Sequence, residues 1–145
     1  MRQTFRHFLM AYVACLILAL ISTLVFGTGI EDSKTLIKQA ATLFILYLSG
    51  SIPFGLLIAQ ALTKKDIRTL GSGNIGTTNV LRTGSKLAAV LTLLFDMLKG
   101  LLPLLALLHF SELSPFPEDL LYGAFIVPVL GHMYPCWLSF KGGKG

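Results

Sequence analysis

Residues 71–82, GSGNIGTTNVLR, form a polar loop in a chain that is otherwise largely apolar. The loop holds three glycines, five hydroxyl or amide side chains and one arginine. Glycine lets the backbone approach a ligand closely, and an arginine guanidinium binds two phosphate oxygens at once. A simple connection between two membrane helices does not need this chemistry. The loop therefore predicts an anion-binding site.

The same loop fits a nucleotide-binding pattern, because residues 71–76 match G-x-G-x-x-G. That fingerprint requires a preceding strand, a βαβ unit and an acidic residue about twenty positions further on. Here an apolar helix and a basic linker precede it, and the acid at that distance, Asp96, falls within a predicted membrane span. We therefore reject dinucleotide binding. The remaining alternative to an anion site is a flexible connector rich in Gly, Asn and Ser.

A second polar segment closes the chain at residues 131–145, GHMYPCWLSFKGGKG. Lys141 and Lys144 offer two ammonium groups, and the glycines beside them offer backbone amides, so together they suit a phosphate cradle. The spacing is not that of a Walker A loop. The alternative is a basic cap that follows a membrane span. His132 is expected near the cytoplasmic end of that span, where it either packs against another helix or joins the site.

Two further features fall inside predicted spans. Asp96 and Lys99 lie three residues apart, on one helical face. A charge at the bilayer centre costs roughly 2.5–3.5 kcal/mol, so we expect an ion pair that faces other helices or orients the site. Residues 49–55, SGSIPFG, interrupt another span and predict a kink with a close packing face.

The composition indicates a membrane protein. Of 145 residues, 54% are hydrophobic and only 13% are charged, with a mean hydropathy of +0.74. A soluble domain usually has about 25% charged residues. The net charge is +5. The sequence has no stripe of basic residues interleaved with aromatics, the pattern that would indicate nucleic-acid binding. Two cysteines as far apart as Cys15 and Cys136 do not indicate a disulfide framework. The sequence has no cluster of Cys and His residues that would indicate a metal site.

Four stretches are long enough to cross about 30 Å of hydrocarbon. We therefore predict an all-α, polytopic transmembrane bundle of about four spans. We expect the two cysteines to be free thiols that are buried in the protein or face lipid. The first stretch is 19 residues long with no A-x-A site after it, which favours a retained helix over a signal peptide. The predicted spans are residues 8–26, 39–62, 87–108 and 120–140.

Loop charges predict the orientation of these spans. When four spans alternate, nine of the twelve basic residues fall on the side of the N-terminus, the polar loop and the C-terminal end. The opposite loop at 109–119 has no Lys or Arg and three acids. The positive-inside rule then places the N-terminus and both polar segments in the cytoplasm.

Four segments together resemble the bacterial acyl-phosphate:glycerol-3-phosphate acyltransferase family: residues 49–55, 71–82, 96–100 and 131–145. The resemblance implies a multi-pass bacterial inner-membrane enzyme of phospholipid biosynthesis. Such an enzyme moves a fatty acyl group from acyl phosphate to the sn-1 hydroxyl of glycerol 3-phosphate, giving lysophosphatidic acid. It uses no metal, cofactor or acyl-CoA, so the expected partners are the two substrates and the bilayer.

The resemblance also assigns site residues. Ser72 and Arg82 resemble the essential polar pair of the family's first motif, and with Asn74 they are the expected catalytic residues. Residues 141–145 resemble the second motif, which binds the phosphate of glycerol 3-phosphate. The expected substrate-binding residues are Gly73, Gly76, Thr78, Asn79, His132, Lys141, Gly142, Gly143, Lys144 and Gly145.

The chain departs from the family pattern at several places. Thr77 replaces a usual alanine, and Tyr134 and Trp137 replace phenylalanines. Residues 1–38 are expected to form an extra N-terminal helix and outer loop, and residues 39–145 the N-terminal part of the acyltransferase domain. The family's third motif, with a His and an Asn needed for activity, is absent. The alternatives are therefore an inactive fragment of the acyltransferase or a phosphate-binding transporter subunit.

Overall fold

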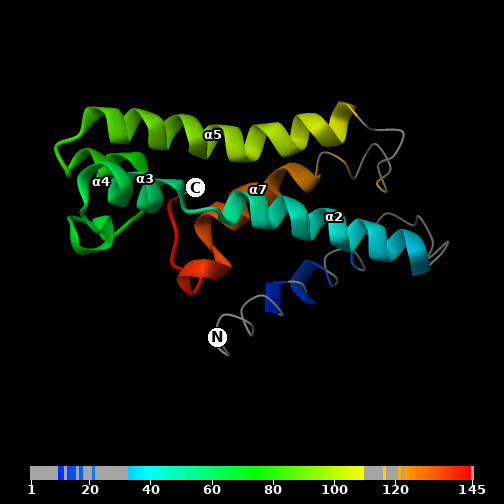
Figure 1. Cartoon of the computed structure of the whole chain (residues 1–145). Coiled ribbons are helices and arrows are strands. Elements are labelled where there is room, and N and C mark those ends of the chain that lie inside the picture. The colour runs from blue at the N-terminus through cyan, green and yellow to red at the C-terminus, as the bar shows by residue number, and fades with distance from the viewer. Residues whose placement is uncertain are drawn as a thin grey trace.

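The computed structural model describes residues 33–109 and 123–144 continuously, with residues 10, 11, 13–15, 17, 21, 116 and 121 in addition. Within these residues all regular structure is helical, which confirms the all-α prediction (Figure 1). The helices are α2 (Ser33–Ser51), α3 (Phe54–Thr63), η1 (Ile67–Thr69), α4 (Thr77–Leu81), α5 (Lys86–His109), η3 (Gly123–Phe125), α7 (Ile126–Met133) and η4 (Cys136–Leu138).

The helices form a layered bundle. Helices α2 and α3 follow one another in nearly the same direction, and α5 returns alongside them (Figure 1). Helix α7 packs along α2, while α4 and η1 gather at the end of the bundle where α3 meets the start of α5. This arrangement places the polar segment between α3 and α5 at one end of the molecule.

Among the described residues, two helical stretches are long and apolar enough to cross a membrane, Lys34–Thr63 and Lys86–His109. They contain the predicted spans 39–62 and 87–108. The predicted span 120–140 corresponds to a shorter apolar helical stretch, Gly123–Leu138. The predicted span 8–26 lies mostly outside the described residues. The count of four spans and the orientation of the N-terminus stay predictions.

A break separates α2 from α3 at Ile52 and Pro53, as the sequence predicted. Proline lacks an N–H group and disfavours a helical conformation in the residue before it. The hydroxyl of Ser51 donates to the carbonyl of Tyr47 at 2.8 Å. The ammonium group of Lys99 donates to the carbonyl of Ile52 at 2.8 Å. Side chains of Ser51 and Lys99 thus donate to two backbone carbonyl groups next to the break, so the break can lie inside the protein.

Helices α2 and α7 meet at their backbones. A Cβ atom on Gly50 would overlap the carbonyl of Pro128, and one on Gly131 would overlap the carbonyl of Tyr47. Small residues allow such close approach between membrane helices. The hydroxyl of Tyr47 also donates to the carbonyl of Tyr134 at 2.6 Å, which ties the end of α7 to α2.

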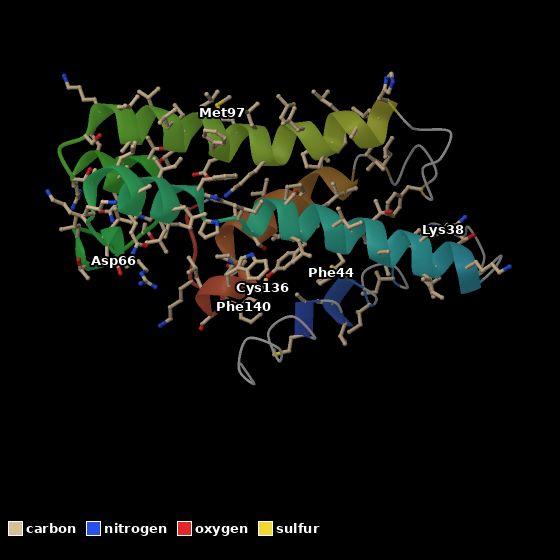
Figure 2. The ribbon with its side chains drawn as sticks, in the orientation of Figure 1. Lys38, Phe44, Asp66, Met97, Cys136 and Phe140 are labelled. Atoms are coloured by element: carbon tan, nitrogen blue, oxygen red, sulfur yellow. The ribbon has the colours of Figure 1, made fainter. Side chains whose placement is uncertain are left out.

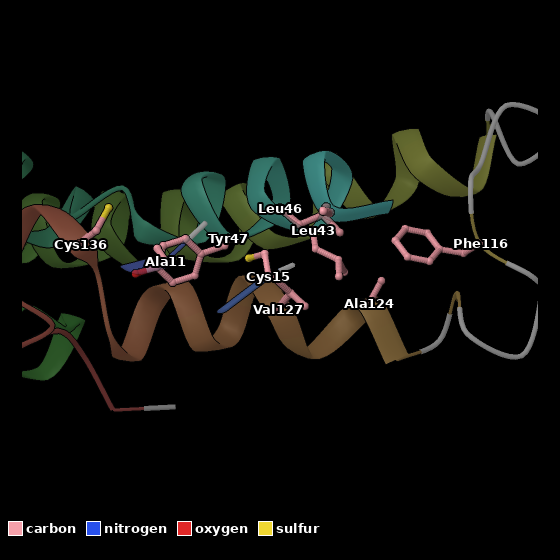
Figure 3. Packing of buried hydrophobic residues seen from close by; sticks show 10 residues of the cluster. Ala11, Cys15, Leu43, Leu46, Tyr47, Phe116, Ala124, Val127 and Cys136 are labelled. Carbon is pink, nitrogen blue, oxygen red and sulfur yellow. The ribbon is translucent and has the colours of Figure 1, made fainter. Parts of the chain in front are cut away.

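Apolar side chains surround this contact and form the main core (Figure 3). The two predicted free cysteines are both buried thiols without a disulfide, as expected. The core contains Ala11, Cys15, Ala40, Leu43, Leu46, Tyr47, Phe116, Ala124, Val127 and Cys136.

The close contact between α2 and α7 predicts that Gly131→Ala lowers the free energy of unfolding by about 1–3 kcal/mol, as overpacking usually does. Thermal unfolding in detergent measures this change. Gly100→Ala is a matched control, because its Cβ would meet only Pro128 at 3.9 Å. Removing a helical glycine stabilises by about 0.5–1 kcal/mol, so this control should be neutral or slightly more stable. Equal destabilisation by both changes would contradict the close contact.

The outer face of α5 is apolar and exposed. Leu87, Val90, Met97 and Leu102 each keep more than half of their surface accessible. Met97 projects away from the other helices (Figure 2). An exposed apolar face of this extent is typical of contact with lipid or with further helices. It fits the membrane class that the composition predicted.

Candidate functional site

The polar segment between α3 and α5 is anchored by a second apolar cluster. Ile67, Ile75 and Val80 are each at most 2% exposed and pack among small residues of α3 and α5. The hydroxyl of Ser85 accepts the N–H of Ala88 at 3.1 Å and so caps the start of α5. The loop is therefore a packed structure, which argues against the flexible connector.

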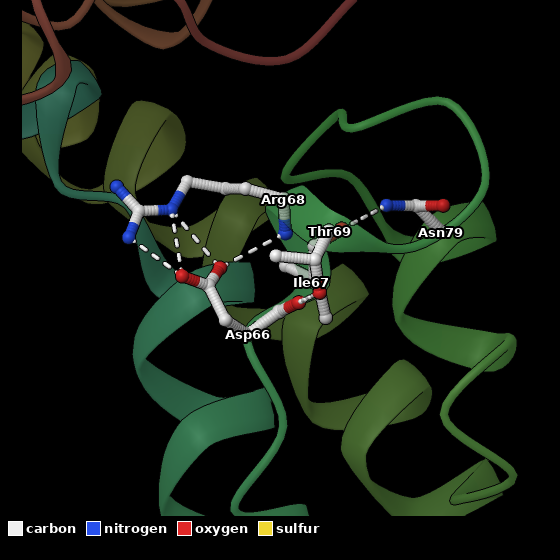
Figure 4. A network of polar contacts seen from close by, with 5 residues as sticks. All are labelled: Asp66, Ile67, Arg68, Thr69 and Asn79. Atoms are coloured by element: carbon white, nitrogen blue, oxygen red, sulfur yellow. Dashed lines mark hydrogen bonds and ion pairs between the residues drawn. The ribbon is translucent and has the colours of Figure 1, made fainter.

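A polar network fixes the first half of the segment (Figure 4). The carboxylate of Asp66 accepts from the backbone N–H of Arg68 at 3.0 Å and pairs with its guanidinium at 2.6 Å. Hydrogen bonds from Arg68 hold the pKa of the Asp66 carboxyl below its usual range. Arg68 is thus already paired within the loop.

Asn79 connects the two halves of the segment. Its side-chain amide donates to the carbonyl of Ile67 at 2.7 Å (Figure 4). It also donates to the carbonyl of Asn74 at 2.8 Å. Asn79 is only 3% exposed. Buried amides bonded in this way fix the local backbone. Asn79 therefore holds the loop around Asn74 in one shape.

A cavity of about 450 Å³ opens between this loop, α5 and the C-terminal segment. It unites residues that lie far apart in the sequence. Its lining consists of Ser72, Asn74, Gly76, Thr77, Thr78, Asn79, Arg82, Leu93, Asp96, His132 and Lys144.

Arg82 enters the site beside a glycine. Gly71 has a positive φ of 49°, and a Cβ atom there would overlap the guanidinium of Arg82. Among the described residues Arg82 forms no ion pair. Its charge is therefore available to an anion in the cavity.

The C-terminal segment folds back against α7. The backbone N–H of Gly142 donates to the carbonyl of Met133, and that of Gly143 donates to the carbonyl of His132, both at 3.1 Å. The fold therefore uses both amides in this structure, and whether they also face a phosphate stays a prediction. A Cβ atom on Gly143 would also overlap the imidazole of His132. Neither glycine has room for a side chain, so both allow close packing of the C-terminal segment against α7.

Charged groups of α5 meet His132 at the wall of the cavity. Lys99 and Asp96 form the predicted ion pair, with 2.7 Å between Nζ and Oδ1 and with side chains 3% and 16% exposed. The Nζ atom of Lys99 also lies 3.0 Å from Nδ1 of His132. The pair thus faces other helices, as expected, and it contacts the C-terminal part of the chain.

The cavity gathers most of the predicted site residues: Ser72, Asn74, Gly76, Thr78, Asn79, Arg82, His132 and Lys144. Gly73, Lys141, Gly142 and Gly143 do not line it. Gly145 lies outside the described residues. Sequence reasoning missed Thr77, although it stands between predicted site residues. It also left open whether Asp96 reaches the site.

Comparison with known proteins identifies the family to which the residues around this cavity belong. Residues 40–145 match the family described as Glycerol-3-phosphate acyltransferase. The chain belongs to this acyltransferase family. All residues of the cavity fall within the matched part of the acyltransferase sequence.

Curated members of the acyltransferase family share about half of the aligned residues. The glycerol-3-phosphate acyltransferase of Bartonella henselae is 52% identical over 102 residues, which are 70% of this chain and 47% of that protein. The one from Methylorubrum extorquens is 52% identical over 105 residues, 72% of this chain and 49% of that protein. The chain thus spans about half the length of the curated relatives it matches.

Solved structures of the acyltransferase family share the fold. The crystal structure of PlsY, an integral membrane glycerol 3-phosphate acyltransferase, in its glycerol 3-phosphate form is 45% identical, with a TM-score of 0.59. The match covers 72% of this chain and 50% of that chain. The lysophosphatidic acid form is 43% identical with a TM-score of 0.57, and the match covers 72% of this chain and 49% of that one.

Proposed function

We propose that this chain carries the phosphate-handling part of a bacterial inner-membrane acyltransferase. The reaction transfers a fatty acyl group from acyl phosphate to the sn-1 hydroxyl of glycerol 3-phosphate and forms lysophosphatidic acid. The observation that supports it most is the cavity that brings Arg82 and Lys144 together beside Ser72 and Asn74. Both substrates are phosphate anions, and two cations at one cavity suit both.

In the proposed reaction, the sn-1 oxygen attacks the acyl carbon and the bond from that carbon to the phosphate oxygen breaks. The departing phosphate accepts the hydroxyl proton, so no covalent enzyme intermediate is needed. Arg82 and Lys144 neutralise the phosphates, while Ser72 and Asn74 orient the acyl phosphate. Alignment of two bound reactants and stabilisation of developing charge supply the acceleration.

An apolar groove beside the cavity suits the acyl chain. Its volume is about 270 Å³, and it shares Leu93, Asp96, His132 and Lys144 with the polar cavity. Its remaining lining comes mainly from apolar residues of α5 and α7. An acyl phosphate whose phosphate lies in the cavity can therefore place its hydrocarbon tail in this groove, between α5 and α7 and toward the lipid. The basic residues around the polar segments favour a cytoplasmic location for the cavity.

Acyl transfer by the chain reconstituted in lipid vesicles tests the proposal. We expect palmitoyl phosphate and labelled glycerol 3-phosphate to yield labelled lysophosphatidic acid, and palmitoyl-CoA to yield none. Ser72→Ala should reduce the product, and mass spectrometry should find no acyl adduct on Ser72. Product formation unchanged by Ser72→Ala, or an acyl-Ser72 adduct, would contradict the mechanism. Uptake of glycerol 3-phosphate without acylation would favour the transporter alternative.

A further inference from the structure

One acidic side chain lines both spaces in which we place the acyl phosphate. The polar cavity and the apolar groove beside it share Leu93, Asp96, His132 and Lys144. The acyl carbon joins the phosphate to the hydrocarbon tail, so an acyl phosphate that spans both spaces has this carbon at the residues they share. The glycerol part of glycerol 3-phosphate must reach the same place to react. Asp96 therefore lies where the two substrates meet.

The carboxyl group of Asp96 has one oxygen facing the protein and one oxygen open. Oδ1 is buried and forms the ion pair with Nζ of Lys99 at 2.7 Å. The side chain as a whole is 16% exposed, so its accessible part lies outside Oδ1. No hydrogen bond or ion pair among the described residues involves Oδ2. Since Asp96 lines the cavity, Oδ2 is free to accept a hydrogen bond from a bound ligand.

An ionised carboxyl group only accepts hydrogen bonds, which restricts the ligand group that it can bind. The phosphate groups of both substrates are anionic, and ionised phosphate oxygens are acceptors as well. Glycerol 3-phosphate supplies two donors, its hydroxyl groups, and acyl phosphate supplies none. In the proposed reaction the sn-1 hydroxyl gives its proton to the departing phosphate. The sn-2 hydroxyl is then the donor that remains for Asp96.

The ion pair with Lys99 makes a carboxylate compatible with an anion site. An isolated carboxylate would oppose Arg82 and Lys144, the two cations of the cavity. Because Nζ of Lys99 lies 2.7 Å from Oδ1, the pair of Asp96 and Lys99 carries no net charge. The carboxylate can thus accept from a hydroxyl at hydrogen-bond distance, while Lys99 largely cancels its repulsion of a phosphate farther away.

We infer that Asp96 is a specificity-determining residue: its Oδ2 accepts a hydrogen bond from the sn-2 hydroxyl of glycerol 3-phosphate and selects acceptors with a hydroxyl group at that carbon. The contact holds the glycerol with its sn-1 oxygen toward the acyl carbon. The identity of the substrate rests on the proposed function. A binding measurement tests the contact without acyl transfer.

Two acceptors that differ at one group test the inference. The first is glycerol 3-phosphate. The second is its 2-deoxy-2-fluoro analogue, in which fluorine, an atom that cannot donate, replaces the sn-2 hydroxyl. For the parent chain in detergent, we expect calorimetry to show about 10- to 100-fold tighter binding of glycerol 3-phosphate, the effect of one hydrogen bond to a charged group. In lipid vesicles, the ratio of kcat/KM for the two acceptors should show the same preference.

Two double variants that differ only at residue 96 isolate the carboxylate. Asp96→Leu/Lys99→Met replaces the pair by apolar side chains of similar size, which leaves neither an unpaired buried charge nor an acceptor. The preference should then fall below about threefold, less than one hydrogen bond. Asp96→Asn/Lys99→Met keeps a neutral acceptor and should give an intermediate preference of about three- to tenfold. Ser72→Ala is the control within the cavity, because it should lower acyl transfer to both acceptors without changing their ratio.

The outcomes separate this inference from the proposed function. Equal binding of the two acceptors by the parent chain would overturn the role of Asp96. The same preference in the parent chain and in Asp96→Leu/Lys99→Met would overturn it as well, since the residue would then act only on the structure. Selective binding that depends on Asp96, without acyl transfer, would support the inference and overturn the proposed reaction. Binding of neither acceptor would overturn both.

Discussion

Replacing Arg82 by alanine is expected to reduce acyl transfer about 100- to 1,000-fold, the usual effect of removing one preorganised group that stabilises transition-state charge. Arg82 lines the cavity and has no ion-pair partner among the described residues, so its charge is free for the phosphate. The rate of lysophosphatidic acid formation measures the effect. Arg82→Lys should keep only part of the parent activity, because an ammonium group does not bind two phosphate oxygens in one plane.

Arg68 offers a matched control from the same segment. It is exposed, pairs with Asp66 and does not line the cavity. Arg68→Ala should therefore change the rate less than about threefold, in the range of a surface ion pair. Gly71→Ala should reproduce part of the Arg82 defect, because its Cβ would overlap the guanidinium. Gly84→Ala shares a positive φ, 91°, but its Cβ meets nothing within 4 Å, so only stability should fall. Equal losses for Arg68→Ala and Arg82→Ala would refute a specific role of Arg82.

Replacing Lys99 by methionine is expected to lower the free energy of unfolding by about 3–5 kcal/mol, because it removes the ion-pair partner of the half-buried Asp96 carboxylate. Lys99 is 3% exposed in its side chain and contacts Asp96 of its own helix, the carbonyl of Ile52 at the helix break and His132 of α7. Thermal or denaturant unfolding in detergent measures the loss. The Ile52 carbonyl at the helix break also loses its donor.

Two further variants separate charge from packing. Lys86→Met makes the same substitution at the exposed start of α5 and should change stability by less than about 0.5 kcal/mol, as surface substitutions do. Asp96→Asn/Lys99→Met removes both charges and should recover much of the stability lost in the single variant. If Lys99→Met unfolded no more easily than Lys86→Met, the ion pair of Asp96 and Lys99 would not contribute to the stability of the fold.

The sequence predicted those features that depend on local chemistry. Apolar runs of sufficient length predicted α5 and the stretch from α2 to α3, and Pro53 predicted the break between the latter two. The spacing of Asp96 and Lys99 predicted their ion pair. The polar loop was recognisable because its donors stand out against an apolar chain.

Features that depend on how distant segments fold together were not predictable. The amides of Gly142 and Gly143 were expected to face a ligand, but the chain reverses after Met133 and brings them onto carbonyls of α7. That reversal follows from tertiary contacts and not from the glycines themselves. The contact between His132 and Lys99 joins residues 33 positions apart. Neither residue type nor spacing indicates such a meeting.

The position of Asp96 and Lys99 within one helix turn bears on how this protein is made. Because the pair is i,i+3, α5 contains its own counter-charge and needs no other segment to neutralise it. Helix α5 leaves the ribosome before α7 does, so residues 87–108 can enter the bilayer with their two charges already paired. His132 then arrives with α7 at a charge pair that is already formed. Biosynthetic insertion and assembly of the site thus become two separate steps in time.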